Sequence, residues 1–297
     1  MNYILTTQNL TKTYGKKDAA KDINIHIREG EIYGLIGRNG AGKTTVMRVI
    51  SGLSKATGGS YELHGENKFG VGVLIESPGI YPNMSAEENL RLKCIAMGCN
   101  SKSYIDGLLK TVGLENTGKK KAGSFSLGMR QRLGIALALV GDPRMIVLDE
   151  PINGLDPQGI VEVRQTLERL RDEKGITIMI SSHILDELSK LATAYGIIHE
   201  GKLLDEFTTE ELAERCGQYV NIRTDNNDRA VALLRQMNCG SVSVDHENCI
   251  RVEGAIDNTV AINKALVDAG VGVKEIFIKN ISLEDYYLSV TGGNHNG

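Results

Sequence analysis

The sequence lacks the features of a membrane-embedded, secreted or nucleic-acid-binding protein. Its 297 residues contain no run near the ~18 consecutive apolar residues that a membrane span requires. Residues 1–5 have no basic region ahead of an apolar stretch, so we expect neither a span nor a secretion signal. With a net charge of −3, the chain has no basic field that would favour nucleic acid as a partner. The basic run at residues 119–121 is interpreted as a solvated surface.

The spacing of the cysteines does not match a zinc site, and their number is odd. An odd count leaves one thiol unpaired in any disulfide scheme, so reduced thiols are the simple interpretation. The cysteines are Cys94, Cys99, Cys216, Cys239 and Cys249. The chain also lacks the Asn-Lys-x-Asp segment with which a GTP-dependent switch would read its base, and it shows no internal repeat.

A glycine-rich segment at residues 37–44 matches the phosphate-loop pattern G-x-x-x-x-G-K-[ST]. The apolar run 32–36 before it predicts a buried parallel strand, and residues 45–50 after it have the spacing of an amphipathic helix. Its glycines let backbone N–H groups turn inward toward phosphate oxygens at the helix N-terminus. We expect Lys43 to neutralise the β and γ phosphates and the Thr44 hydroxyl to coordinate Mg²⁺. A chance glycine-rich turn is the alternative, which the flanking strand and helix disfavour.

Two carboxylates follow a second apolar run, residues 145–148. Ligands of parallel sheets bind at the carboxyl ends of the strands, where Asp149 and Glu150 would stand. Asp149 suits a hold on Mg²⁺, and Glu150 suits a general base that orients water onto the γ phosphate. A solvated strand end is the alternative, which the upstream phosphate loop makes the weaker interpretation.

Residues 125–132 resemble the signature of the ATP-binding cassette (ABC) ATPases, whose usual form is Leu-Ser-Gly-Gly-Gln. Ser126 has the character of a helix N-cap, and the resemblance implies that Ser126 and Gly128 face the γ phosphate of ATP held by a partner subunit. Leu127 and Met129 depart from the family pattern. Losing a glycine at Leu127 stiffens the helix entry but keeps the anion-binding N–H groups, so we expect the contact to survive.

Further motifs of this family occur in the family's order. The resemblance, which covers about residues 1–210, implies that Tyr14 stacks on adenine, that Asp156 belongs to a dimer loop, and that His183, after the strand 176–180, contacts the γ phosphate. Taken singly, Tyr14 matches an ordinary strand-end tyrosine and His183 a surface histidine. The implied catalytic residues are Glu150, His183 and Lys43. The implied ATP-binding residues are Tyr14, Gly37, Arg38, Asn39, Gly40, Ala41, Gly42, Lys43, Thr44 and Thr45.

Glu76 stands where most family members have a glutamine. A carboxylate can only accept hydrogen bonds and adds a negative charge beside the metal, so we expect Thr44, Glu76 and Asp149 to hold Mg²⁺. With its neighbours, Glu76 makes the chain resemble the ATPases of bacitracin-resistance and lantibiotic-immunity exporters. The alternative is a position that tolerates either residue.

The predicted fold is α/β: a P-loop NTPase core of the ABC type over residues 1–210, with an antiparallel β subdomain and a helical subdomain at about 77–130. Residues 211–297 are expected to form a separate α+β domain. Their order of strand, helix, two strands, helix and strand indicates a ferredoxin-like layer, followed by a last helical turn capped at Ser282 and a disordered tail.

The resemblance implies an ATP-binding and ATP-hydrolysing subunit of an exporter. It would form a homodimer around two ATP molecules with Mg²⁺, and would lie in the cytoplasm against the inner face of the cell membrane. A separate polytopic membrane subunit would contact residues 77 to about 125, and the cargo would be a peptide antibiotic. The alternative is a soluble ABC ATPase that remodels a ribosome or nucleic-acid complex. Such proteins usually carry paired cassettes, zinc modules or a coiled-coil insertion, none of which this sequence shows.

Overall fold

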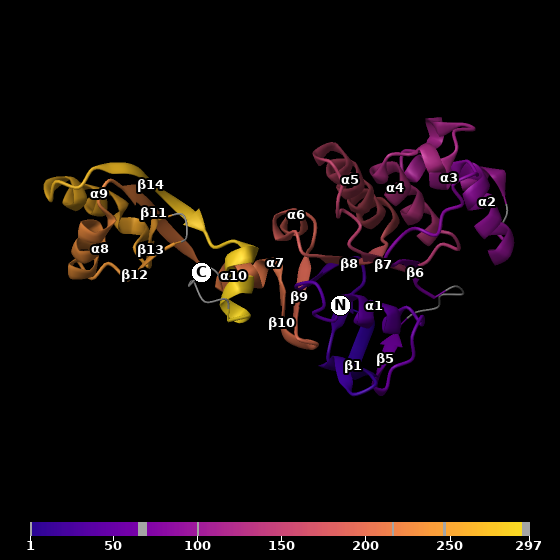
Figure 1. Ribbon diagram of the computed structural model, residues 1–297, viewed down its shortest axis with the longest axis horizontal. Coiled ribbons are helices and arrows are strands. Elements are labelled where there is room, and N and C mark those ends of the chain that lie inside the picture. The colour runs from indigo at the N-terminus through magenta and orange to yellow at the C-terminus, as the bar shows by residue number, and fades with distance from the viewer. Residues whose placement is uncertain (1, 65–69, 100, 216, 246–247, 293–297) are drawn as a thin grey trace. The chain divides into compact units, whose positions relative to one another are not determined.

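The computed structural model describes residues 2–64, 70–99, 101–215, 217–245 and 248–292 (Figure 1). Its contacts divide into two compact units, Met1–Thr209 and Glu210–Gly297. The tail expected to be disordered, from residue 293 onward, and Cys216 lie outside the described residues. The other four cysteines are free thiols.

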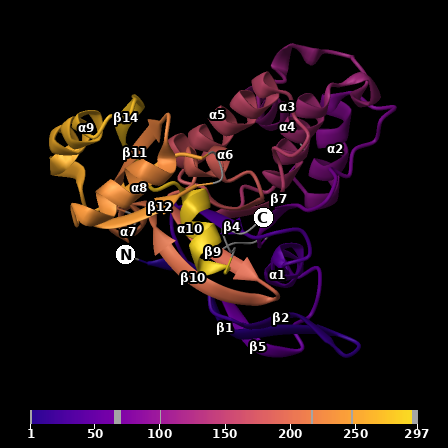
Figure 2. The same ribbon diagram turned by 60° about the vertical axis from the view of Figure 1, so that its left-hand side comes forward.

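A six-stranded, mostly parallel sheet forms the centre of the first unit, in the order β10-β9-β4-β8-β7-β6. The strands β4, β7 and β8 are buried along their whole length, which explains the apolar runs that they contain. Strand β10 closes one edge and runs antiparallel to β9 (Figure 2). The strand bounds are β4 Ile32–Ile36, β6 Gly72–Leu74, β7 Met145–Asp149, β8 Thr177–Ser182, β9 Ala194–His199 and β10 Lys202–Thr208.

An antiparallel sheet packs beside the central one. Strand β1 (Tyr3–Tyr14) pairs with β2 (Lys17–Ile23), β3 (His26–Arg28) and β5 (Gly58–Leu63). Its buried isoleucines and leucines share one hydrophobic core with β4, β7 and helix α1 (Lys43–Ile50). The strand and helix expected around the phosphate loop are therefore β4 and α1.

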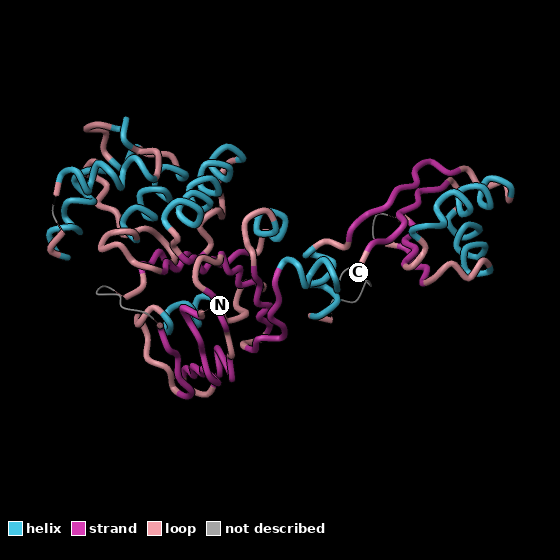
Figure 3. The backbone as a smooth tube through the Cα atoms, turned by 180° about the vertical axis from the view of Figure 1, so that it is seen from behind, coloured by secondary structure: helices cyan, strands magenta, loops and turns pink. Residues whose placement is uncertain are grey.

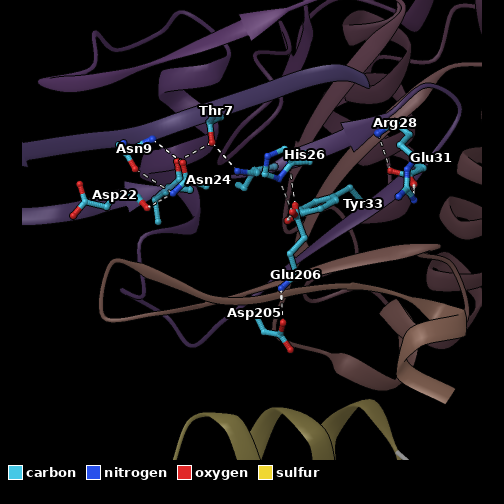
Figure 4. Close-up of polar contacts among 12 residues, drawn as sticks. Thr7, Asn9, Asp22, Asn24, His26, Arg28, Glu31, Tyr33, Asp205 and Glu206 are labelled. Carbon is cyan, nitrogen blue, oxygen red and sulfur yellow. Dashed lines mark hydrogen bonds and ion pairs between the residues drawn. The ribbon is translucent and has the colours of Figure 1, made fainter. Parts of the chain in front are cut away.

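Glu206 of β10 ties this antiparallel sheet to the central one (Figure 4). Its carboxylate accepts hydrogen bonds from the Tyr33 hydroxyl at 2.9 Å and the His26 backbone N–H at 2.8 Å, and it contacts His26 Nδ1 at 2.8 Å. Burial, together with the neighbouring carboxylate, raises the pKa of Tyr33 well above its usual range. The phenol therefore stays protonated as a donor within the core.

The remaining helices of the unit lie together on one side of the central sheet (Figures 1 and 3). Side-chain caps fix where four of them begin: Ser85 with Glu88 in a capping box for α2, Ser101 for α3, Asp156 for α5 and, as expected, Ser126 for α4. The bounds are α2 Ala86–Met97, α3 Lys102–Thr111, η1 Glu115–Thr117, η2 Ala122–Ser124, α4 Leu127–Ala138, α5 Pro157–Lys174 and α6 Leu185–Ser189.

The second unit has its own sheet, in the order β12-β13-β11-β14, with every neighbouring pair antiparallel. The succession β11-α8-β12-β13-α9-β14 is the order expected from the sequence. One face of the sheet packs on α8 and α9, and Ser282 caps the final helix α10. The bounds are α7 Thr209–Arg215, β11 Gln218–Thr224, α8 Asn227–Gln236, β12 Ser241–Val244, β13 Ile250–Glu253, η3 Ile256–Asn258, α9 Thr259–Asp268, β14 Val273–Asn280 and α10 Leu283–Val290.

Candidate functional site

The phosphate loop joins β4 to α1 and packs so closely that two of its glycines cannot be replaced without movement. A Cβ on Gly37 would lie 2.5 Å from the Ile198 carbonyl oxygen, and one on Gly42 would lie 2.5 Å from that of Ala19. Gly42 also has φ 113°, which side chains rarely adopt. As the N-cap of α1, Gly42 supplies no side-chain acceptor, so the first N–H groups of the helix are available to an anion.

Lys43 is buried beneath this loop with its ammonium group held in two directions. Nζ donates to the Gly37 carbonyl at 2.6 Å and lies 3.2 Å from Glu150 Oε1. Only 5% of the residue is exposed. A buried ammonium must keep its partners, and phosphate oxygens arriving at the loop would supply new ones.

Thr44 and Asp149, which are both predicted to hold Mg²⁺, are in contact. The Thr44 hydroxyl donates to Asp149 Oδ2 at 2.7 Å, and the other carboxylate oxygen accepts from Ser181 Oγ at 2.5 Å. Hydroxyl and carboxylate oxygens are the hard donors that Mg²⁺ prefers, so this pair fits the metal. Ser181, at the end of β8, was not identified from the sequence, although its position two residues before His183 could have indicated it.

Glu150 and His183, which follow the neighbouring strands β7 and β8, are in contact with each other. His183 Nδ1 lies 2.8 Å from Glu150 Oε2. Glu150 has φ 50°, in the left-handed region, and its N–H donates to Ser181 Oγ at 2.9 Å. Non-glycine residues hold this conformation only where their surroundings enforce it, often at functional sites. Ser181 therefore orients both acids.

A cavity of about 640 Å³ opens over the loop. Tyr14 lies in its wall with Lys12 Nζ 4.9 Å from the ring centroid, and Lys12 also donates to the Lys55 carbonyl at 2.8 Å. The predicted residues in the lining are Tyr14, Arg38, Asn39, Gly40, Gly42, Lys43, Thr44, Thr45 and Glu150. The lining residues that the sequence analysis missed are Lys17, Asp18, Ala19, Glu200 and Gly201. The first three begin strand β2, the last two form the turn between β9 and β10, and none of them carries a motif.

Glu76 does not line this cavity. Its carboxylate forms an ion pair with Arg48 of α1, its side chain is 64% exposed, and its backbone has φ 67°. The structure thus brings Thr44 and Asp149 together but turns Glu76 toward Arg48. That Glu76 is a metal ligand stays a prediction.

The signature residues lie where α4 meets α5, away from the cavity lining. Ser126 caps α4 by accepting from the Met129 N–H at 3.2 Å, and a Cβ on Gly128 would lie 3.5 Å from Gly159 Cα. Asp156 caps α5 by accepting from the Gly159 N–H at 2.9 Å. The three predicted residues thus gather at two adjacent helix N-termini.

A phosphate loop between a buried parallel strand and a helix, with carboxylates at the end of β7 in the same sheet, defines a P-loop NTPase. Residues 20–153 match the family model described as ABC transporter. The chain is 43% identical to a bacitracin transport ATP-binding protein of Bacillus licheniformis, with 99% of each chain covered. It is 46% identical to a lantibiotic transport ATP-binding protein of Streptococcus pyogenes over 68% of this chain and 90% of that one. The chain belongs to the family of ABC transporter ATP-binding proteins.

Solved structures agree with this assignment. A dimeric ATP-binding cassette bound to ADP and Pi superposes with a TM-score of 0.61 and 26% identity, covering 69% of this chain and 98% of that one. The expected ABC ATPase fold is confirmed. No helix in the described ranges combines the length and apolar character that crossing a bilayer demands.

Proposed function

We propose that this protein binds ATP with Mg²⁺ and hydrolyses it to drive an exporter. The observation that carries this proposal is the placement of Glu150, which contacts both Lys43 beneath the phosphate loop and His183 at the next strand end. Tyr14 would stack on the adenine at the cavity wall, and the loop would enclose the phosphates.

The phosphates of ATP would take Lys43 from Glu150 and so free Oε1 to accept a hydrogen bond from water. The water oxygen attacks the γ phosphorus, the bond to the bridging oxygen breaks, and ADP leaves with that electron pair while the water proton passes to Glu150. When protonated, His183 donates Nε2–H to a phosphate oxygen. Mg²⁺, held by Thr44 and Asp149, would supply charge neutralisation at the β and γ phosphates.

The active form would be a homodimer that encloses two ATP molecules. Ser126 and Gly128 of each copy would face the γ phosphate in the other, with Asp156 in the adjoining loop. The pairing of two helix N-termini at α4 and α5 supports this role, because such ends attract phosphate. ATP then favours the closed dimer by the extra contacts it makes there.

The Glu150→Gln variant tests this mechanism. The amide cannot accept the water proton, so we expect ATP turnover to fall by roughly 10²–10⁴-fold while ATP binding persists. Light scattering with saturating Mg²⁺ and ATP should then show a dimer. Lys43→Ala should lose nucleotide binding altogether. Full turnover by the glutamine variant would remove Glu150 from its role, and single particles at saturation would refute the homodimer.

An apolar groove between the central sheet and the helical subdomain would dock a polytopic membrane subunit. It encloses about 490 Å³, and its walls include Leu53, Tyr81 and Leu92, which are 63%, 56% and 39% exposed. Exposed apolar side chains lining a concave surface are typical of a site that receives an apolar helix face. The protein would thus work at the cytoplasmic face of the membrane.

Two variants of α2 test this docking. Leu92→Asp places a charge in the groove and should abolish sedimentation of the chain with membranes of its source cells, because burying an unpaired carboxylate is unfavourable. Ile95→Asp is the matched control, since Ile95 is 55% exposed on the same helix but does not line the groove. Both should retain ATP binding. Equal sedimentation of the two variants would reject the groove as the docking site.

The proposed cargo is a peptide antibiotic. Two relatives are named for bacitracin and lantibiotic transport, and the bacitracin relative is matched over 99% of both chains. These names favour a transporter subunit over the ribosome-directed alternative. Deleting the gene should lower resistance to a bacitracin-like or lantibiotic peptide, and unchanged resistance to both would reject this cargo.

A further inference from the structure

Strand β14 forms one edge of the sheet in the second unit and exposes apolar side chains there. In the described part of the chain it pairs with β11 alone. Phe277 and Ile278 are each 45% exposed. Because successive strand residues point to opposite faces, exposure of both shows that neither face is covered at this point. Figures 1 and 3 both show β14 along the rim of its unit.

An edge of this kind is a template for another strand, because its outward N–H and C=O groups have no neighbour in the sheet. Soluble proteins usually protect such edges with charge, and β14 carries Lys274 and Lys279. It also carries Glu275, however, and places three apolar residues between that acid and Lys279. The charges therefore do not simply repel a second strand.

We propose that β14 of two copies of this chain pair antiparallel about a twofold axis through Phe277, which joins the two sheets into one. In this register Phe277 faces its own counterpart, and Ile276 faces Ile278 of the second copy. Glu275 faces Lys279 of the second copy. Aromatic, aliphatic and opposite-charge pairs are those that stabilise cross-strand contacts, and the symmetry makes each unlike pair occur twice.

Neighbouring symmetric registers lose this match. Centring the pair on Ile276 sets Glu275 opposite Phe277, and centring it on Ile278 sets Lys279 opposite Phe277. Both leave the ion pairs unformed and bring a charge against an aromatic ring. The order Glu-Ile-Phe-Ile-Lys at residues 275–279 is therefore complementary to itself in one register. Glu275 also lies 3.8 Å from Arg223 of β11, so its carboxylate would stand between two cations.

Cross-linking of the full chain without nucleotide tests the pairing. Phe277→Cys places two thiols across the twofold axis, so a short bis-maleimide should yield a covalent dimer on a denaturing gel. Val260→Cys is the matched control, because Val260 is 82% exposed on α9 of the same unit. The parent chain gives the background from native thiols. Cross-linking of the Phe277→Cys chain no greater than that of the control would overturn the proposal.

A charge exchange fixes the register. In the Phe277→Cys background, Glu275→Lys alone and Lys279→Glu alone each place like charges opposite one another twice, so each should lower the dimer yield about tenfold. Mixing the two chains pairs every Lys with a Glu and should restore the yield. A mixture that cross-links no better than either chain alone would refute this register. Since no nucleotide is present, either failure leaves the proposed ATP turnover untouched.

Discussion

At the residue scale, Ser181 connects the two acids of the site. Its hydroxyl donates to Asp149 and accepts from the backbone N–H of Glu150, so one buried side chain orients the metal-binding carboxylate and the left-handed residue beside it. Sequence reasoning placed Asp149 and Glu150 because acids at a strand end carry a recognisable pattern. It did not place Ser181, because the one signal in the sequence is its position two residues before His183, and its contacts with the two acids arise through pairing across the sheet.

We expect Ser181→Ala to lower ATP turnover about ten- to hundredfold and to destabilise the fold by about 1–3 kcal/mol, because the buried Glu150 N–H loses its acceptor. Steady-state ATP hydrolysis and denaturant unfolding measure the two effects. The matched control is Thr177→Ala, which removes a buried hydroxyl that accepts from the Gly30 N–H at the other end of β8. It should lose similar stability and keep its turnover. Equal turnover in both variants would show that Ser181 has only a structural role.

At the element scale, a close approach of α4 to the segment after β6 fixes the route of the chain past Glu76. A Cβ on Gly134 would lie 2.7 Å from Pro78 Cβ and 3.0 Å from Leu74 Cδ1. The strands β4, β7 and β8 were predictable because buried parallel strands contain apolar runs that are rarely broken. This helix contact was not, since a glycine within a helical sequence does not reveal what packs against it.

Gly134→Ala should therefore destabilise the protein by about 1–3 kcal/mol, because the added methyl has no room. Gly107→Ala in α3 is the control: its Cβ would meet no atom within 4 Å, so it should stabilise the protein by about 0.5–1 kcal/mol. Denaturant unfolding of both variants measures the difference. Stabilisation by both substitutions would contradict the close contact.

At the scale of the whole molecule, the chain divides into two units with separate cores. The motifs of the sequence all fall in the first unit, and they predicted its ABC fold correctly because their order and spacing are specific. The walls contributed by the start of β2 and by the β9–β10 turn were not predicted. Such segments gain their role only when the sheets bring them together around the loop.

The stability of the first unit should fall in alkali. Because the pKa of Tyr33 is raised in the fold, the unfolded chain loses the phenol proton first, at about pH 10. Stability is therefore full below that pH and declines above it by about 1.4 kcal/mol per pH unit until the folded pKa is reached. Hydrogen exchange of the β4 amides at about pH 9 and pH 11 measures this. Tyr33→Phe should show a shallower decline, and an unchanged slope would disprove the assignment.

The turn between β9 and β10 has a consequence for engineering the chain. The Gly201 N–H donates to the Ala41 carbonyl at 2.9 Å, and the Gly201 carbonyl accepts from the Lys21 N–H at 2.7 Å. Gly201 therefore links the phosphate loop to β2. Surface hairpin tips commonly tolerate epitope tags and reporter insertions. The β9–β10 turn should not tolerate them, since lengthening it would break the hydrogen bonds that hold the phosphate loop in place. A fusion partner belongs instead at the loop between β12 and β13, remote in sequence from every motif.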